Sequence, residues 1–317
     1  MRLQRVILAG PRGFCAGVER AIDVVERALE LFDETIYVRK EIVHNRHVVE
    51  ALMRQGAVFV DELDEVPPGA TVIFSAHGVS PQVWKQAEEK QLRVIDATCP
   101  LVTKVHFEVR RFVQENYSII LIGHLDHDEV IGTMGEAPEH IQVIGKIEEV
   151  ARVEVPDPNK VVCLTQTTLS VDDTKAIVQA LKARFPAMIL PSKDDICYAT
   201  QNRQMAVKAL AQKADLILVL GAKNSSNSNR LREVAEMAGT RAILVGHVRE
   251  LNPKWFEDIQ TIGITAGAST PEFLVQEVVE YCRNLGATQV EELIVTTEDV
   301  RFALPTELHL PSDSLTA

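Results

Sequence analysis

ILAGPRGFCAGVERAIDVV, residues 7–25, contains an apolar run, then a turn with glycine and proline, then apolar residues at helical spacing. The pattern predicts a strand that leads into a helix, with Cys15 at the start of the helix. A thiol at a helix N-terminus meets free backbone N–H groups and the positive end of the helix dipole. Both favour the thiolate, which is the metal-binding form of cysteine. Cys15 is therefore a candidate metal ligand.

Two further cysteines stand in the same local context. Cys99 lies in VIDATCPLVTKVHFEV, residues 94–109, and Cys197 lies in DDICYATQNRQMAVKAL, residues 194–210. The three cysteines are 84 and 98 residues apart, which is far too wide for the short C-x-x-C pairs of a zinc finger. The spacing predicts that three similar modules each donate one ligand.

Two more landmarks recur behind each cysteine, as expected of an internal repeat. The first is a polar turn 28 or 29 residues further on, at His44, His127 and Ser225. The second is a strand end 60 to 68 residues further on, in FSAHGVSPQVWKQA, LTQTTLSVDDTKAI and ITAGASTPEFLVQEV. Nine landmarks in the same order favour a threefold repeat.

The last landmark of each repeat carries a helix start signal. Ser80, Ser170 and Thr270 align with one another and are predicted to be helix N-caps. Pro81 and Pro271 would then occupy the first helical position, where a missing N–H costs nothing.

Eleven apolar runs alternate with segments of helical length and periodicity, which is typical of α/β modules with largely parallel sheets. In such sheets ligands bind at the carboxyl ends of the strands, where all nine landmarks fall. The sequence therefore predicts three pseudo-symmetric α/β modules. The predicted modules are residues 1–98, 99–195 and 196–317, the last with a polar tail after about residue 290 that wraps back on the body.

The composition excludes several classes of partner. Lys and Arg number 33 against 45 Asp and Glu, a net charge of −12, and aromatic residues make up only 5%. An acidic chain with few aromatics is a poor binder of nucleic acids or anionic membranes. No apolar run approaches the roughly 20 residues of a membrane span, and MRLQRVILAG lacks a secretory h-region. We expect a cytoplasmic protein without nucleic-acid or membrane partners.

Three thiolates allow two kinds of metal centre. An iron–sulfur cluster with three protein ligands keeps one iron open for chemistry. Zinc also binds through three protein ligands and a water molecule, and the residues alone leave both alternatives open. Cys163 lies inside a predicted strand and Cys282 inside a predicted helix, so both are interpreted as buried structural residues.

Polar residues at the other landmarks suit an anion. Three histidines occupy strand-end turns of the repeat, and imidazole can donate hydrogen bonds to phosphate oxygens. Small hydroxyl and amide residues in GAKNSSNSN and TAGAS precede predicted helices, whose N-termini bind anions. The candidate anion ligands are His44, His77, His127, Ser225, Ser226, Asn227 and Ser269.

Glu129 is the candidate proton carrier. It follows His127 by two residues, and a pocket that buries it would raise the pKa of its carboxyl group. The neighbouring Asp126 and Asp128 would push the pKa in the same direction. Thr167 faces the same region according to the repeat alignment.

The motifs PRGFCAGV, VHN, SAHGVS, DATCPLV, GTMG, TQTTLSVDDT, DDICYAT, KNSSNSNRL and TAGAS resemble the family of 4-hydroxy-3-methylbut-2-enyl diphosphate reductases, from about residue 2 to residue 285. The resemblance implies three α/β domains in a trefoil arrangement around a central 4Fe-4S cluster. It assigns Cys15, Cys99 and Cys197 to the cluster. It assigns the diphosphate to the seven anion ligands named above and proton transfer to Glu129 and Thr167, beside His127.

The resemblance also implies the reaction, which is the last step of the non-mevalonate isoprenoid pathway. (E)-4-Hydroxy-3-methylbut-2-enyl diphosphate would be reductively dehydroxylated to isopentenyl and dimethylallyl diphosphates, with two electrons passing through a cluster with an open apical iron. The electron donor would be a ferredoxin or a flavodoxin. Because an open iron is labile, the cluster could also be recovered as 3Fe-4S.

The chain departs from the family pattern G-H-x-G-H-P-E-V at two positions. Asp126 replaces the glycine and Asp128 the proline, and we expect an altered loop rigidity or pH optimum there. Two rival functions stay open: a zinc-dependent hydrolase of phosphorylated substrates, and a non-catalytic ligand or redox sensor.

Overall fold

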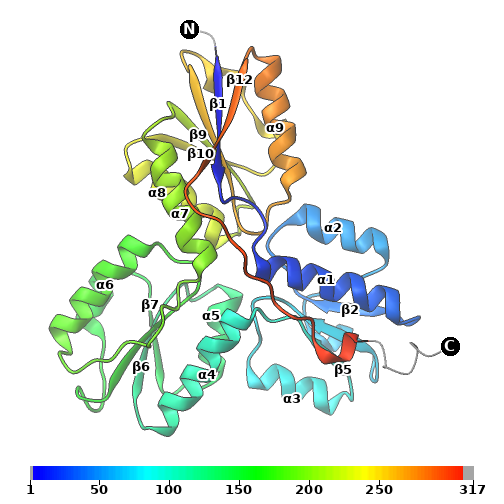
Figure 1. Cartoon of the computed structure of the whole chain (residues 1–317). Helices are drawn as coiled ribbons and strands as arrows, with labels where there is room; N and C mark the ends of the chain where they lie inside the picture. Colours follow the sequence, from blue (N-terminus) through cyan, green and yellow to red (C-terminus); the bar gives the residue numbers. More distant parts are fainter. Residues whose placement is uncertain (1–2, 310–317) are drawn as a thin grey trace.

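The structure is a computed structural model that describes residues 3–309. Three lobes surround a common centre in a trefoil (Figure 1), and each lobe contains one sheet whose paired strands are all parallel. Each of the eleven apolar runs forms a strand. The prediction of three α/β modules in a trefoil arrangement is confirmed.

The elements follow one another in three groups. The first lobe contains α1 Ala16–Leu31, β2 Ile36–Arg39, α2 Arg46–Gln55, β3 Val58–Val60, β4 Thr71–Phe74, α3 Pro81–Glu89 and β5 Arg93–Asp96. The second contains α4 Pro100–Gln114, β6 Ser118–Ile122, α5 Asp128–Gly135, β7 Ile141–Ile144, β8 Val161–Thr165 and α6 Val171–Arg184. The third contains β1 Arg5–Gly10, α7 Tyr198–Ala211, β9 Leu216–Leu220, α8 Ser226–Met237, β10 Arg241–Val245, β11 Thr261–Ala266, α9 Glu272–Asn284 and β12 Gln289–Ile294.

The strand order shows the repeat directly. The sheets read β3-β2-β4-β5, β7-β6-β8 and β10-β9-β11-β1-β12, so each begins with the second, first and third strands of its repeat. Two hydrophobic clusters pack against each sheet, one per face, as in other three-layer α/β folds. The sequence identity between the repeats is too low to show this common topology, but the regular spacing of the landmarks predicts it.

A fourth strand position explains where the cysteines lie. Beside the third strand of each repeat lie β5, an isolated bridge at Ile189, and β1. The chain leaves each of these positions and enters the next lobe at Cys99, Cys197 and Cys15, respectively. Each cysteine therefore stands at a passage between two lobes.

This cyclic arrangement corrects the predicted first module. Residues 1–98 were predicted to form one module, but β1 pairs with β11 and β12 in the third sheet. β1, the strand that precedes Cys15, therefore completes the sheet of the last repeat and not that of the first. Cys197 also differs from the prediction, because an irregular segment with the bridge at Ile189 precedes it instead of a full strand.

The predicted landmarks lie at helix N-termini. Cys15, Cys99 and Cys197 are the N-caps of α1, α4 and α7. Ser80 and Ser170 cap α3 and α6 as predicted.

The third predicted cap is one residue off. Pro271, expected at the first helical position, is itself the N-cap of α9 in place of Thr270. The Thr270 hydroxyl donates to Leu220 instead (3.1 Å), which ties it to the sheet.

Residues 295–309, here called the C-terminal strap, run from β12 across the centre of the molecule to the first lobe (Figure 1). Leu308 packs in the core of that lobe. Glu298 of the strap pairs with Arg203 of α7 at 3.0 Å, and the Arg203 side chain is fully buried. Arg203 also donates to the carbonyl oxygens of Gly13 and Phe14, so it ties the loop before Cys15 to α7.

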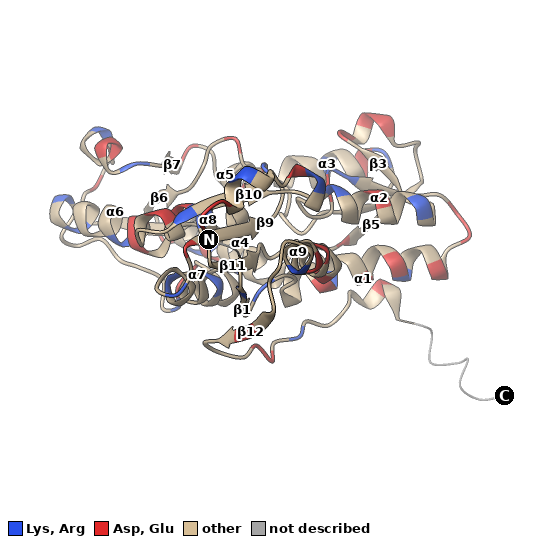
Figure 2. Ribbon diagram, turned by 90° about the horizontal axis from the view of Figure 1, so that it is seen from above, with Lys and Arg blue, Asp and Glu red and all other residues tan. Residues whose placement is uncertain are grey.

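Charged residues of both signs are interspersed over all three lobes (Figure 2). Within residues 3–309, none of the helices is both long and apolar enough to cross a membrane.

Candidate active site

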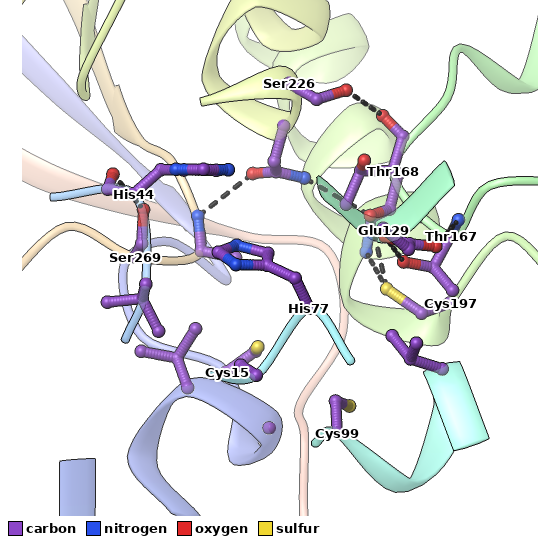
Figure 3. Close-up of a pocket in the computed structure, with 18 of the residues that line it drawn as sticks. Cys15, His44, His77, Cys99, Glu129, Thr167, Thr168, Cys197, Ser226 and Ser269 are labelled. Atoms are coloured by element: carbon purple, nitrogen blue, oxygen red, sulfur yellow. Dashed lines mark hydrogen bonds between the residues drawn. The ribbon is translucent and has the colours of Figure 1, made fainter. Parts of the chain in front are cut away.

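All twelve predicted site residues line one cavity, where the three lobes meet. In Figure 3, Cys15 and Cys99 lie toward the bottom, Cys197 lies at the right beside Glu129 and Thr167, and His44 and Ser269 lie at the left. The elements that supply them are the N-termini of helices and the carboxyl ends of strands, as the repeat predicts.

The three cysteines line the cavity, and none of them is in a disulfide. Gly17, in the first turn of α1, keeps the space between them open. A Cβ atom at Gly17 would lie 2.6 Å from the Cys99 Sγ and 3.9 Å from the Cys15 Sγ. The Cys197 Sγ contacts the Thr200 hydroxyl at 3.2 Å.

Burial raises the pKa of the Cys99 thiol to about 12 and that of Cys197 to about 11, opposite to the expected direction. The N–H groups of Leu101 and Val102, at the start of α4, do oppose the shift at Cys99. Desolvation outweighs them, and the neighbouring thiols raise the pKa further because like charges repel. The three residues are half-buried, and a bound metal centre would reverse this balance because a cation stabilises the thiolates.

Three imidazoles line the same cavity. The ring centroids of His44 and His77 are 4.1 Å apart, and His127 lies edge-on to both at 5.3 and 5.8 Å. Burial lowers the pKa of His127 to about 4 and holds that of His77 well below its usual value. Both rings are therefore neutral at physiological pH and can donate from only one nitrogen.

The third lobe contributes small polar groups beside the histidines. Ser225 caps α8, so the helix begins at the cavity. Asn227 donates to the Thr200 hydroxyl at 3.2 Å and accepts from the Ala268 N–H at 2.9 Å. The Ser269 hydroxyl donates to the His44 carbonyl oxygen at 3.0 Å, which joins this group to the first lobe. A helix N-terminus among such donors is suited to bind a phosphate group.

Glu129 is buried on the third side of the cavity, with 4% of its surface exposed. Its carboxyl oxygens accept from the Thr167 N–H at 2.7 Å and from the Thr167 hydroxyl at 2.9 Å (Figure 3). Burial raises the pKa of Glu129 to about 7, although the Thr167 hydrogen bonds oppose the shift. A carboxyl group with this pKa can hold and release a proton near neutrality.

The charge that adds to this shift is not the expected one. Asp195, from the loop before Cys197, raises the pKa of Glu129. Asp126 is exposed and Asp128 is partly exposed at the rim, so water screens them from the buried carboxyl.

Among the lining residues that the sequence did not predict, two have polar side chains, Thr168 and Thr200. Thr200 accepts from Asn227 and contacts the Cys197 thiol, and the Thr168 carbonyl accepts from Ser226 at 3.3 Å. Thr200 stands three residues after Cys197, the spacing at which a cap contacts the first turn of its helix. That spacing could have identified Thr200, whereas the backbone role of Thr168 leaves no signal in the sequence.

Comparisons with known proteins agree with this geometry. The LytB protein family model matches residues 6–283. A 4-hydroxy-3-methylbut-2-enyl diphosphate reductase of Aromatoleum aromaticum is 56% identical over 97% of this chain and 99% of its own length. One of Bordetella pertussis is 58% identical over 95% of this chain and 92% of its own. The solved structure of the E-1-hydroxy-2-methyl-but-2-enyl-4-diphosphate reductase from Plasmodium falciparum superposes with a TM-score of 0.93, at 40% identity and 97% coverage of both chains.

The trefoil fold, with a cavity that gathers thiols, imidazoles and a buried carboxyl group, and these similarities define an enzyme of the reductase class. More particularly, the chain belongs to the LytB protein family.

Proposed function

We propose that the protein reduces (E)-4-hydroxy-3-methylbut-2-enyl diphosphate to isopentenyl and dimethylallyl diphosphates, as the last step of the non-mevalonate pathway. Two electrons and two protons enter, the allylic C–O bond breaks, a C–H bond forms, and water leaves. The observation that carries the proposal is the buried Glu129 carboxyl group, which lines the same cavity as three free thiols and three imidazoles.

Cys15, Cys99 and Cys197 would hold a 4Fe-4S cluster. Their chemistry fits this group, because they are three free thiols around a space that Gly17 keeps open. When bound, the cluster would supply the two electrons and an open iron site.

The diphosphate would be held by the histidines and the hydroxyl and amide group of the third lobe. Neutral His77 and His127 can donate from Nε2, and α8 offers its N-terminus beside Ser225. Fixing the diphosphate at one end would place the carbon skeleton over the thiols and near Glu129, which lowers the entropic part of the barrier.

Glu129 would supply a proton to the departing hydroxyl group. With a pKa raised to about 7, the carboxyl is about half protonated at neutral pH. Thr167 donates to both of its oxygens and so fixes the carboxyl group, and the two residues line the same cavity. Burial excludes bulk water from the same point.

The proposal includes an external electron donor of the ferredoxin or flavodoxin type and a cytoplasmic location. A one-electron carrier is needed because the sequence has neither a flavin nor a nicotinamide fingerprint.

The test is anaerobic purification, followed by iron and sulfide counts and EPR spectra with and without the hydroxylated allylic diphosphate. We expect about four irons per chain and a spectrum that the substrate alters. Zinc without sulfide, or a cluster whose EPR spectrum does not change when the hydroxylated allylic diphosphate is added, would contradict the proposal.

A further inference from the structure

The three cavity imidazoles differ in what holds their Nδ1 atoms. The His127 Nδ1 accepts a hydrogen bond from the Glu129 N–H at 3.2 Å. The His77 Nδ1 lies 3.2 Å from the Ser75 hydroxyl. The His44 Nδ1 lies 3.1 Å from a carboxyl oxygen of Glu41. The Asn224 amide nitrogen lies further off, at 3.4 Å from this Nδ1, and donates to the Glu41 oxygen.

These partners fix different tautomers. A backbone N–H only donates, so the Nδ1 of His127 is bare and its neutral ring carries the proton on Nε2. A carboxylate only accepts, so the Nδ1 of His44 carries the proton and the Nε2 of a neutral ring has a lone pair. A serine hydroxyl can do either, and it leaves His77 free to present Nε2–H.

A lone pair cannot donate to a phosphate oxygen. His44 can therefore bind a diphosphate through Nε2 only after it takes up a proton, whereas His77 and His127 can bind it as neutral rings. We propose that Glu41 is a positioning residue that makes His44 bind the diphosphate as an imidazolium ion, so that one proton enters the site together with the substrate. This inference rests on the proposed function and adds a residue to it.

Two other imidazoles and the carboxyl groups of Glu41 and Asp128 surround the His44 ring. The nearest titratable rings, His77 and His127, stay neutral because burial lowers the pKa of both. The Asp128 carboxyl lies within 4.8 Å of both His44 and His77 and favours the charged ring. The rim of the site also contains His124, Asp126, Lys223, Arg230 and Glu233.

Glu41 also joins two lobes. The Asn224 amide, from the loop before α8, donates to the same Glu41 oxygen at 2.9 Å. His44 and Asn224 share this one acceptor, so the ring is fixed relative to the N-terminus of α8. Both bonds hold the pKa of Glu41 below its usual value, which keeps it an acceptor.

The experiment measures proton uptake when inorganic diphosphate binds to the anaerobic holoenzyme. Titration calorimetry at one pH near 8, in buffers of different ionisation enthalpy, gives the number of protons bound. The Glu41→Gln variant is the test, since a glutamine amide no longer requires Nδ1–H. Ser75→Ala is the matched control beside His77.

We expect the wild type and Ser75→Ala to take up about one proton more than Glu41→Gln. The wild-type Kd should rise about tenfold per pH unit on the alkaline side, and that of Glu41→Gln should rise less. Equal proton uptake in the wild type and Glu41→Gln would overturn the inference.

Failure of the proposed function looks different. If neither inorganic diphosphate nor the hydroxylated allylic diphosphate binds the holoenzyme, then the proposed function is wrong, and the role of Glu41 falls with it. If both bind and only the proton count disagrees, then the proposed function stands and Glu41 has a merely structural role.

Discussion

Glu129 shows how the surroundings of a single residue change its acidity. Its carboxyl group is buried, and burial raises its pKa to about 7, above the ordinary value of 4.5. The folded protein thus binds the proton more tightly than the unfolded chain. Stability contributed by the neutral carboxyl is fully present below about pH 4.5 and is lost as the pH rises through about 7.

Replacement of Glu129 by Gln separates these two effects. We expect Glu129→Gln to bind diphosphate normally and to lose most of its turnover, because the amide cannot deliver a proton. It should be more stable than the wild type at pH 8, by about 3 kcal/mol at most, and equally stable below pH 4.5. Turnover and denaturant unfolding across this pH range measure both, and near-normal turnover would refute the proton role.

Gly17 provides a second prediction for a single residue. Gly17→Ala places a methyl group 2.6 Å from the Cys99 Sγ, so the thiols must move apart. We expect the variant to fold but to bind clearly less iron and sulfide than the wild type after anaerobic reconstitution. Gly145→Ala is a suitable control, because it lies outside the cavity and its Cβ would meet the nearest atom at 3.3 Å. Equal iron content in the two variants would contradict a metal centre at this point.

Single residues with local signals were predictable from the sequence, and those with distant partners were not. The cysteines and histidines stand in repeated turns, so their spacing reveals them. Arg203 resembles any basic residue of an amphipathic helix, yet it is fully buried and bonds a loop 190 residues away. Glu41 likewise gains its importance from Asn224 in another lobe.

The C-terminal strap acts on the site as an element. Glu298 supplies the only carboxylate among the Arg203 contacts in the described chain, and the other acceptors are carbonyl oxygens. Removal of one partner leaves a buried charge uncompensated, which is costly even where the intact pair adds little.

We therefore expect Glu298→Ala to lower the free energy of unfolding by about 3 kcal/mol. The control is Glu291→Ala on β12, whose ion pair with Arg5 is largely exposed and should contribute less than about 1 kcal/mol. Denaturant titration of both variants makes the comparison. Similar losses in the two would show that the strap does not anchor Arg203.

Elements were predicted well where periodicity decides them. The placement of β1 was missed because its partners, β11 and β12, follow it by more than 250 residues. An apolar run has the same pattern in either sheet, so only the three-dimensional closure of the trefoil decides which sheet takes it.

At the scale of the whole molecule, the site belongs to no single lobe. Each lobe gives one cysteine and part of the polar lining. A ligand that binds only this assembled arrangement stabilises it by mass action.

Metal removal should consequently lower the melting temperature of the whole protein. We expect the anaerobic holoenzyme to melt at a higher temperature than the chelator-treated protein, with a single transition. The difference should shrink strongly in Cys197→Ser, which lacks one of the three ligands. A metal-free protein that melts at the same temperature as the holoenzyme would contradict a metal centre that binds only the assembled arrangement of the three lobes.

The position of the cysteines at the passages between lobes has a consequence for chain entropy. A centre that joins Cys15, Cys99 and Cys197 closes two successive loops of 84 and 98 residues. In the chain-entropy treatment of cross-links, loops of this length restrict the unfolded chain by about 5 kcal/mol each. An inorganic centre placed there would act as a three-way covalent staple, and oxidative damage to it would release the tether between all three parts of the chain at once.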